Sequence, residues 1–329
     1  MITATSYPRA ALIGNPSDGY YGKTIAFVFG NFKAEVTLEE SPELKMTPGI
    51  HDRLSFFDIN DLTHDIQQNG YYGGIRLLKG TIKKFKDYCG EQKIELPKRN
   101  FSISYSSNIP VRLGLAGSSA IVTAAMNAML QFYKIDIPQP ILANLILSVE
   151  KDELNIGAGL QDRVAQVYNS PVYMNFNKEL MDKQGYGDYI PFDKKLLPPL
   201  YIAYRTHLSE GSEVTHNNLA ERYAAKDTSV LDAIEQLKTL TDQCWANLQQ
   251  GDQNIGVLLN KNFDIRKKLV TVSKGNLEMI EAVRVVGASA KFTGSGGAII
   301  GTYDGNKMYD DLVSVMKKID VAVIKPQVI

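Results

Sequence analysis

Cysteine is scarce in this chain of 329 residues, which has two, Cys89 and Cys244. Two cysteines far apart in sequence exclude a disulfide framework and a four-cysteine zinc site. No apolar run approaches the roughly 18 residues of a membrane span, and the first residues lack a basic start followed by an apolar core. We therefore expect a cytoplasmic protein that does not interact with membranes.

An excess of charge of one sign is also missing. Lys and Arg total 36, Asp and Glu total 36, and the formal net charge is zero. The chain thus has no bulk electrostatic reason to bind nucleic acid or an anionic surface. Its four histidines, His51, His64, His207 and His216, show no metal-binding spacing such as HExxH. Because the net charge is zero, any site for an anion must be formed by a local group of residues.

What is present is ordinary for a globular protein, with 44% apolar and 22% charged residues. At about 150 residues per domain, the length suggests two domains. A polar, glycine-containing stretch follows the strand pattern of residues 171–177. We therefore place one domain junction near residue 175, which gives domains of residues 1–175 and 176–329.

The hydrophobic pattern predicts alternating strands and helices. Residues 24–39 predict two strands, and the alternation in 101–109 predicts another. Apolar residues at intervals of three and four predict a helix over 74–88. The small and apolar run after Ser118 predicts a buried helix with Ser118 as its N-cap. Further strands are predicted in residues 171–177, 198–206 and 292–303, with mainly helices after 175.

Residues 108–120, NIPVRLGLAGSSA, carry the clearest chemical signal. Gly114 and Gly117 allow the backbone to approach phosphate oxygens, a helix start offers N–H groups, and a serine hydroxyl can bind magnesium. Taken alone, the segment is also typical of a cap before a buried helix. GxxxxGK[ST] and GxGxxG are absent, so neither a Walker A loop nor a dinucleotide fingerprint is present.

The segment resembles the second signature of the GHMP kinases, the galacto-, homoserine, mevalonate and phosphomevalonate kinases. The matching residues are Pro110, Gly114, Leu115, Ala116, Ser118, Ser119 and Ala120, with Gly117 as an added residue. The two other signatures follow in the family's order. Residues 8–18 resemble the opening segment, and residues 291–297, KFTGSGG, resemble the third glycine loop. The resemblance spans residues 8–301, and the chain is identified by it as a member of this family.

The resemblance implies an α/β (α+β) protein with the two-domain GHMP kinase fold. The N-terminal domain is expected to be ribosomal protein S5 domain 2-like, with a left-handed crossover, and to bind ATP. The C-terminal domain is expected to be ferredoxin-like. In the family, ATP and the acceptor lie in the cleft between the two domains.

The resemblance also assigns roles to the phosphate and metal residues. The ATP-binding residues are expected to be Pro110, Gly114, Leu115, Ala116, Gly117, Ser118, Ser119 and Ala120. Glu150, near the end of a predicted helix, is expected to bind Mg²⁺ with Ser119. A serine oxygen, a carboxylate and phosphate oxygens suit this ion. The added Gly117 leaves open whether Ser118 or Ser119 is the ligand.

The remaining roles concern the acceptor. Asp162 is expected to orient and deprotonate the acceptor hydroxyl, and Arg9 to contact the γ-phosphate or that hydroxyl. Substrate binding is assigned to Asn15, Asp18, Gly294, Gly296 and Gly297.

Within the family, the opening segment GNPSDGYYGKTIAF is more similar to glucuronokinase and related sugar 1-kinases than to the mevalonate branch. The implied reaction is transfer of the γ-phosphate of ATP to the anomeric hydroxyl of a sugar, with glucuronate as the expected acceptor. A uronate carboxylate needs a cation or several N–H donors. Lys23, Arg112 and Arg205 are the candidates, and the sequence does not choose among them.

Other functions stay open at this point. A heptose phosphate or another sugar is the alternative acceptor, and a non-catalytic nucleotide- or metabolite-binding module is the alternative class. An oxidoreductase on a Rossmann scaffold is disfavoured, because GSGGAIIG has Ile299 where the third glycine belongs. We expect a small-molecule substrate, no nucleic-acid partner, and a monomer or homodimer.

Overall fold

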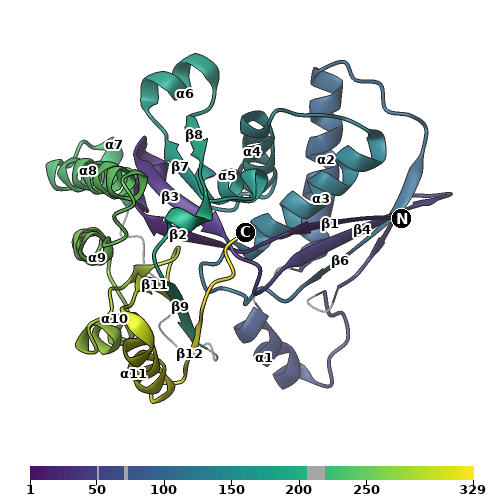
Figure 1. Ribbon diagram of the computed structural model, residues 1–329. Helices are drawn as coiled ribbons and strands as arrows, with labels where there is room; N and C mark the ends of the chain where they lie inside the picture. Colours follow the sequence, from purple (N-terminus) through teal and green to yellow (C-terminus); the bar gives the residue numbers. More distant parts are fainter. Residues whose placement is uncertain (50–51, 70–72, 206–218) are drawn as a thin grey trace. The chain divides into compact units, whose positions relative to one another are not determined.

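The computed structural model describes residues 1–49, 52–69, 73–205 and 219–329, and His51, His207 and His216 lie outside them (Figure 1). Contacts divide the chain into two compact units. Unit 1 consists of Met1–Pro8, Phe32–Arg112 and Ala116–Asn169. Unit 2 consists of Arg9–Asn31, Leu113–Leu115 and Ser170–Ile329.

This division differs from the predicted halves, residues 1–175 and 176–329. Strands β2 (Arg9–Ile13) and β3 (Lys23–Val28) lie early in the chain but belong to unit 2. The physical reason is strand pairing, since β3 pairs with both β2 and β7 (Val172–Asn175). A pairing between strands so far apart in sequence cannot be read from local hydrophobic patterns.

Unit 1 is built on one four-stranded sheet. Its strand order is β1 (Ile2–Ser6), β4 (Ala34–Ser41), β6 (Asn100–Ser107) and β5 (Lys45–Thr47). Strand β6 buries Phe101, Ile103 and Tyr105, while the serines between them are less buried. This alternation has the period of two that a sheet with one buried face requires. The strand predicted over residues 101–109 is thus confirmed, but it ends at Ser107.

The helices of unit 1 include one that is buried along most of its length. The elements are α1 (Ile59–Asn69), α2 (Gly74–Glu91), α3 (Gly117–Tyr133), α4 (Gln139–Ser148), the π-helical turn η2 (Val149–Glu153) and α5 (Leu160–Tyr168). Helix α3 packs against β1, β4 and α2. The predicted buried helix is confirmed, but Ser118 as its N-cap was wrong. Ala116 occupies the cap in a left-handed conformation, and Ser118 lies in the first turn.

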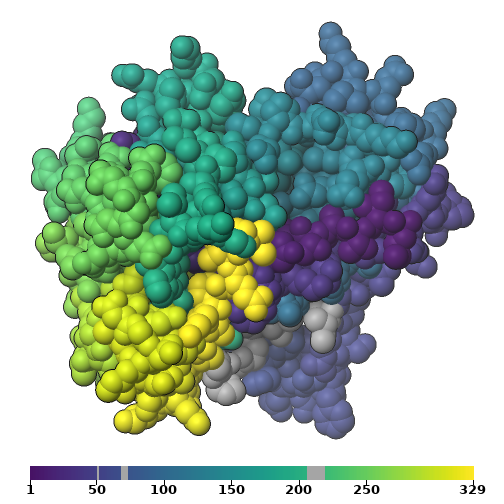
Figure 2. Space-filling model, in the orientation of Figure 1, coloured from purple at the N-terminus to yellow at the C-terminus, as the bar shows by residue number. Residues whose placement is uncertain are grey.

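Helix α1 forms part of the surface of unit 1 (Figure 2). Its described side chains are half-buried or exposed, and Phe57 just before it is 94% exposed. In the part of the chain that the structure describes, no helix is both long and apolar enough to cross a membrane.

Unit 2 contains two four-stranded sheets. In one, the order is β2, β3, β7 and β8 (Asp188–Pro191), all antiparallel. In the other, the order is β10 (Lys291–Phe292), β11 (Ala298–Thr302), β9 (Leu200–Arg205) and β12 (Val321–Ile324). The strands predicted in residues 171–177, 198–206 and 292–303 are confirmed with shorter bounds, residue 206 lying outside the described range.

The helices of unit 2 lie between its strands along the chain. They are α6 (Lys178–Gln184), α7 (Leu219–Ala224), α8 (Thr228–Gln249), α9 (Gly256–Leu269), α10 (Lys274–Val285) and α11 (Gly305–Lys317), with 3-10 turns η1 (Ser17–Tyr20) and η3 (Lys194–Leu196). Figure 1 shows α8, α9, α10 and α11 along one side of the unit. Tyr201, Phe263 and Phe292 belong to the buried cluster that joins these helices to the sheet.

The two cysteines offer a direct test of this packing. Both are free and buried, and burial raises the pKa of the Cys89 thiol and raises that of Cys244 to about 12. Since the thiolate is the reactive form, we expect Ellman's reagent to label native protein slowly and both thiols rapidly in concentrated guanidinium chloride. Rapid labelling of both thiols in the native protein would contradict the buried positions of Cys89 in α2 and Cys244 in α8.

Candidate active site

The glycine-serine loop has an unusual backbone. Arg112, Gly114 and Ala116 have φ values of 61°, 65° and 62°, in the left-handed region. Glycine adopts this conformation without strain, whereas any other residue in it costs about 1–2 kcal/mol of conformational free energy. Such residues cluster at ligand-binding loops, where the surrounding structure holds them in place. Leu113–Leu115 of this loop belong to unit 2, and Ala116 begins the next segment of unit 1.

The start of α3 is arranged to attract an anion. Its N-cap residue, Ala116, makes no side-chain hydrogen bond to the first turn. Its first-turn N–H groups and the positive end of its dipole are those that bind phosphate in other proteins. Gln166 of α5 donates from Nε2 to the carbonyl oxygens of Ala116 and Tyr7, both at 3.0 Å. The residue before the helix is therefore fixed by a side chain that the sequence analysis did not single out.

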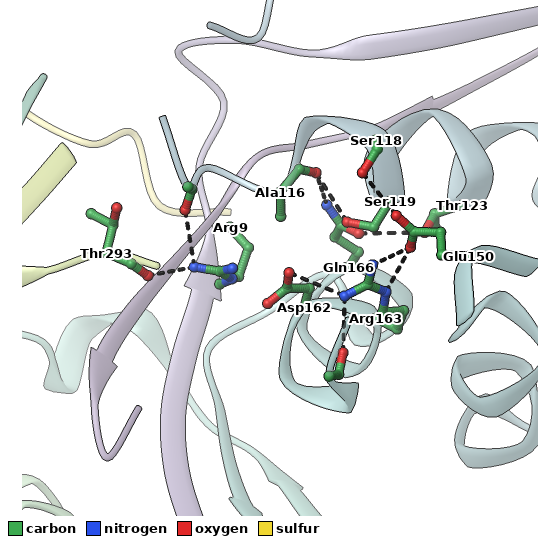
Figure 3. A network of polar contacts seen from close by, with 12 residues as sticks. Arg9, Ala116, Ser118, Ser119, Thr123, Glu150, Asp162, Arg163, Gln166 and Thr293 are labelled. Carbon is green, nitrogen blue, oxygen red and sulfur yellow. Dashed lines mark hydrogen bonds and ion pairs between the residues drawn. The ribbon is translucent and has the colours of Figure 1, made fainter. Parts of the chain in front are cut away.

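Glu150 is the buried carboxylate of the site. It lies in η2 and is 0% exposed. Ser118 Oγ donates to Glu150 Oε1 at 2.8 Å (Figure 3). Ser119 Oγ instead donates to the Ala116 carbonyl oxygen at 3.0 Å. The structure therefore places the Ser118 hydroxyl, rather than that of Ser119, against Glu150, while the metal role of either serine stays a prediction.

Arg163 provides the counter-charge for Glu150. Its Nε lies 2.8 Å from Glu150 Oε2, and its Nη2 contacts the same oxygen. Its Nη1 donates to Asp162 Oδ2 at 3.2 Å and to the Gly159 carbonyl oxygen at 2.9 Å (Figure 3). The arginine side chain is 4% exposed, and a buried carboxylate is stable only when it is paired and hydrogen-bonded. The sequence analysis missed Arg163, although its place next to Asp162 was a usable signal.

The oxygens of Glu150 and Ser118 in unit 1 suit a hard cation that takes few ligands from the protein and keeps water or phosphate oxygens as the others. A carboxylate oxygen and a hydroxyl oxygen in contact are the kind of ligand that Mg²⁺ takes from a protein. Among the described residues, no group of three or more His, Cys, Asp or Glu side chains is placed to hold a metal ion. Phosphate oxygens and water would have to supply the remaining ligands.

In unit 2, Arg9 connects the second and third glycine loops. It is 4% exposed at the start of β2. Its Nη1 donates to the Gly114 carbonyl oxygen at 3.3 Å and to the carbonyl oxygen of Thr293. The backbone N–H of Arg9 donates to the carbonyl oxygen of Leu115. Arg9 therefore connects three segments that are far apart in the sequence: β2, the second glycine loop and the third glycine loop.

The residues of unit 2 that are predicted to bind the acceptor lie in two places. Asn15 and Asp18 belong to the opening segment, and Gly294, Gly296 and Gly297 belong to the third glycine loop. Asn15 is 3% exposed, its Nδ2 lies 3.5 Å from the Phe292 carbonyl oxygen, and its own carbonyl oxygen accepts from Asn262 at 3.2 Å. Asp18 lies in η1 and its charge acts on Arg266. Gly296 and Gly297 have φ values of 147° and 81°. Asn15 is thus brought to the strand that leads into the third glycine loop.

Roles for two buried basic side chains of unit 2, Arg266 and Lys291, were not foreseen. Arg266 donates to the carbonyl oxygens of Gly294 at 2.7 Å and Ser295 at 3.2 Å. Burial lowers its pKa to about 10, with a smaller contribution from Arg9 that Asp18 opposes. Lys291 donates to the Ala11 carbonyl oxygen at 2.6 Å, and burial lowers its pKa well below the usual range. Arg266 therefore holds two carbonyl groups of the third glycine loop, whereas Lys291 links the start of that loop to β2.

The three cations considered for a substrate carboxylate each have a protein partner. Lys23 pairs with Asp242 at 2.6 Å. Arg205 contacts Glu278 at 3.1 Å, and Arg112 donates to the Gln67 carbonyl oxygen at 3.1 Å. Their role toward a carboxylate stays a prediction.

A substitution at Gly294 tests the contact between the two glycine loops. A Cβ there would lie 2.1 Å from the Gly114 carbonyl oxygen and 3.0 Å from Arg9 Nη1. Overpacking of this kind lowers folding stability by about 1–3 kcal/mol. Because the second glycine loop and Arg9 must move to relieve it, we expect Gly294→Ala to lower kcat/KM by about tenfold or more. Gly90→Ala, where nothing lies within 4 Å, is the matched control and should leave it unchanged. Equal activity of the two variants would show that the loop contact is unimportant.

The fold and the sequence of this chain are similar to those of known proteins. The family model described as GHMP kinases N terminal domain matches residues 76–170. The crystal structure of Methanococcus jannaschii mevalonate kinase aligns with a TM-score of 0.72 at 20% identity, covering 100% of this chain and 98% of that one. This likeness confirms the expected mixed α/β class and defines the fold as that of a GHMP kinase.

Relatives at higher identity narrow the family further. Glucuronokinase 1 of Arabidopsis thaliana is 44% identical over 306 residues, which cover 91% of this chain and 84% of that protein. Probable glucuronokinase 2 of the same plant is 43% identical over 303 residues, covering 90% and 82%. The chain therefore belongs to the GHMP kinases and, within them, to the family of the glucuronokinases.

Proposed function

We propose that this chain is an ATP-dependent sugar kinase that transfers the γ-phosphate of ATP to the anomeric hydroxyl of glucuronate, forming glucuronate 1-phosphate. The observation that carries the proposal is the 44% identity to Arabidopsis glucuronokinase 1 over 91% of the chain. The residues add an independent chemical argument. Unit 1 combines a helix start without a side-chain cap, a buried carboxylate beside a hydroxyl, and a further carboxylate on α5.

The phosphates of ATP bind, in this proposal, to residues 110–120. The first-turn N–H groups of α3 attract an anion more strongly than a neutral ligand, because the positive end of the helix dipole lies at the same place. Glu150 binds Mg²⁺ together with a serine, and the 2.8 Å contact to its carboxylate favours Ser118 over Ser119. When bound, Mg²⁺ offsets negative charge on the phosphates.

Asp162 accepts the proton of the attacking hydroxyl. Arg163 Nη1 contacts its Oδ2, which fixes the direction in which the carboxylate points. Phosphoryl transfer has a loose transition state with charge on the transferred oxygens, so positioning and cations matter most. Arg9 supplies such a cation. Acceptor binding is assigned to Asn15, Asp18, Gly294, Gly296 and Gly297.

The proposal extends to the surroundings of the enzyme. We infer a cytoplasmic location, since both cysteines are free thiols and a reducing compartment keeps thiols in that state. We also infer that the protein acts as a monomer or homodimer on a small-molecule substrate.

A screen of ATP consumption tests the proposal. Purified protein with Mg²⁺ and ATP is assayed against glucuronate, galacturonate, glucose and heptose phosphates. We expect glucuronate to give the highest kcat/KM and glucose at least about tenfold less, because the lost charged hydrogen bond contributes about 1.5–3 kcal/mol. ATP consumption with a heptose phosphate but not with glucuronate would contradict the acceptor, and no consumption with any sugar would contradict the kinase activity.

A further inference from the structure

Arg163 has more contacts than the pairing of one buried carboxylate requires. Two of its nitrogens contact Glu150 Oε2, and the third contacts Asp162 Oδ2 and the Gly159 carbonyl oxygen. It therefore links the proposed metal ligand to the proposed base. Both of these carboxylates owe their roles to the proposed function, and the inference below rests on it.

The charges of this group are unequal. Glu150 and Asp162 bring two negative charges and Arg163 brings one positive charge, while the Ser118 hydroxyl on Glu150 Oε1 is neutral. Glu150 is 0% exposed, whereas the Asp162 side chain is 20% exposed. The buried carboxylate is thus balanced by the arginine within the protein, and water reaches only the other carboxylate.

The two oxygens of Glu150 have separate partners. Oε2 is held by the guanidinium group, and Oε1 faces the first turn of α3 through Ser118. Arginine binds carboxylates in a rigid planar fork, so it fixes the orientation of the group as well as its charge. Glu150 is therefore held with Oε1 toward the helix start, where the phosphates are proposed to bind.

We infer that Arg163 is a positioning residue that neutralises Glu150 in the nucleotide-free enzyme, so that a divalent ion binds there only together with a nucleotide. A free ion meets a carboxylate whose charge is already balanced, together with one hydroxyl oxygen. An ion bound to ATP or ADP brings phosphate oxygens as further ligands and negative charge that the start of α3 accepts. Metal binding is in this way made conditional on the nucleotide.

Binding of Mn²⁺, followed by electron paramagnetic resonance, tests this inference without any acceptor or turnover. We expect the native protein to bind Mn²⁺ weakly alone and tightly with ADP. Arg163→Gln should bind Mn²⁺ alone about tenfold more tightly, because a unit positive charge near the ion is removed. Arg163→Lys keeps that charge and is the matched control, expected within about threefold of the native protein. Equal affinities of native protein and Arg163→Gln for Mn²⁺ alone would overturn the inference.

A second measurement covers the case in which Arg163→Gln folds poorly. If the arginine acts as the counter-ion of Glu150, Mg²⁺ without nucleotide should replace it and raise the unfolding temperature of Arg163→Gln but not that of the native protein. The double variant Glu150→Gln/Arg163→Gln should fold without Mg²⁺ and show no such rise. Absence of any Mg²⁺ effect on Arg163→Gln would overturn the inference.

The variant Glu150→Gln separates this inference from the proposed function. We expect it to lose nucleotide-dependent Mn²⁺ binding, and full retention would overturn Glu150 as the metal ligand and the inference with it. Failure to phosphorylate glucuronate, with Mn²⁺ binding as expected, would instead contradict only the proposed acceptor.

Discussion

Replacing Asp162 by asparagine should lower kcat by about 10²–10⁴-fold, the usual contribution of a positioned general base. Asparagine keeps the size of the side chain and an oxygen for Arg163 Nη1, which lies 3.2 Å from the carboxylate. It cannot accept the proton of the hydroxyl. Because Asp162 lies outside residues 110–120, we expect the KM for ATP to change little. Steady-state kinetics at saturating ATP and glucuronate measures both parameters.

Asp152→Asn is the matched control for this substitution. Asp152 is an exposed carboxylate in η2, two residues from Glu150. We expect its replacement to leave kcat within about twofold of the native value, as for most exposed side chains away from the reacting groups. Near-normal turnover of a correctly folded Asp162→Asn variant would remove Asp162 from the role of base.

Replacing Glu150 by glutamine should lower the free energy of unfolding by up to about 3–5 kcal/mol, because the buried Arg163 would lose this carboxylate and keep the contact to Asp162, at 3.2 Å, as a counter-charge. The guanidinium side chain is 4% exposed and Glu150 is 0% exposed, so water cannot take over the lost pairing. Urea unfolding of the nucleotide-free protein, followed by circular dichroism, measures the change. The double variant Glu150→Gln/Arg163→Gln should be less destabilised than the sum of the two single variants.

Glu153→Gln is the control for burial. Glu153 pairs with Lys83 at 3.0 Å, and the side chain of Lys83 is 56% exposed. An exposed ion pair contributes about 0–1 kcal/mol, so this variant should unfold almost as the native protein does. A loss at Glu150 no larger than the loss at Glu153 would show that the Glu150–Arg163 pair is hydrated in solution.

The parts of the fold that could be predicted from sequence are those with a clear local period. Strand β6 alternates along its whole length, and α2 and α3 follow helical spacing or a long apolar run. The N-cap of α3 could not be predicted from residue type. Ser118 has a favourable side chain for a cap, but its hydroxyl donates to Glu150, and the left-handed Ala116 is the N-cap of a helix that begins at Gly117.

The site divides in the same way. The glycine loops are contiguous signatures, and Glu150 and Asp162 lie in one continuous stretch between the second and third of them, so the sequence could point to both acidic residues. Arg163 and Arg266 depend on contacts with residues 13 and 28 positions away, and Gln166 depends on a contact 159 positions away. Arg266 and Gln166 have no local pattern, whereas Arg163 is marked only by its place next to Asp162. All three side chains act by fixing groups to which the sequence already points.

Identification of the product tests the central claim most directly. Glucuronate, ATP and Mg²⁺ are incubated with the protein, and the sugar product is examined by ¹H and ³¹P NMR. We predict one phosphate on the anomeric oxygen, seen as coupling between phosphorus and the anomeric proton, with loss of the reducing end and one ADP formed per product. A phosphate on any other oxygen, or release of inorganic phosphate with glucuronate unchanged, would contradict the account.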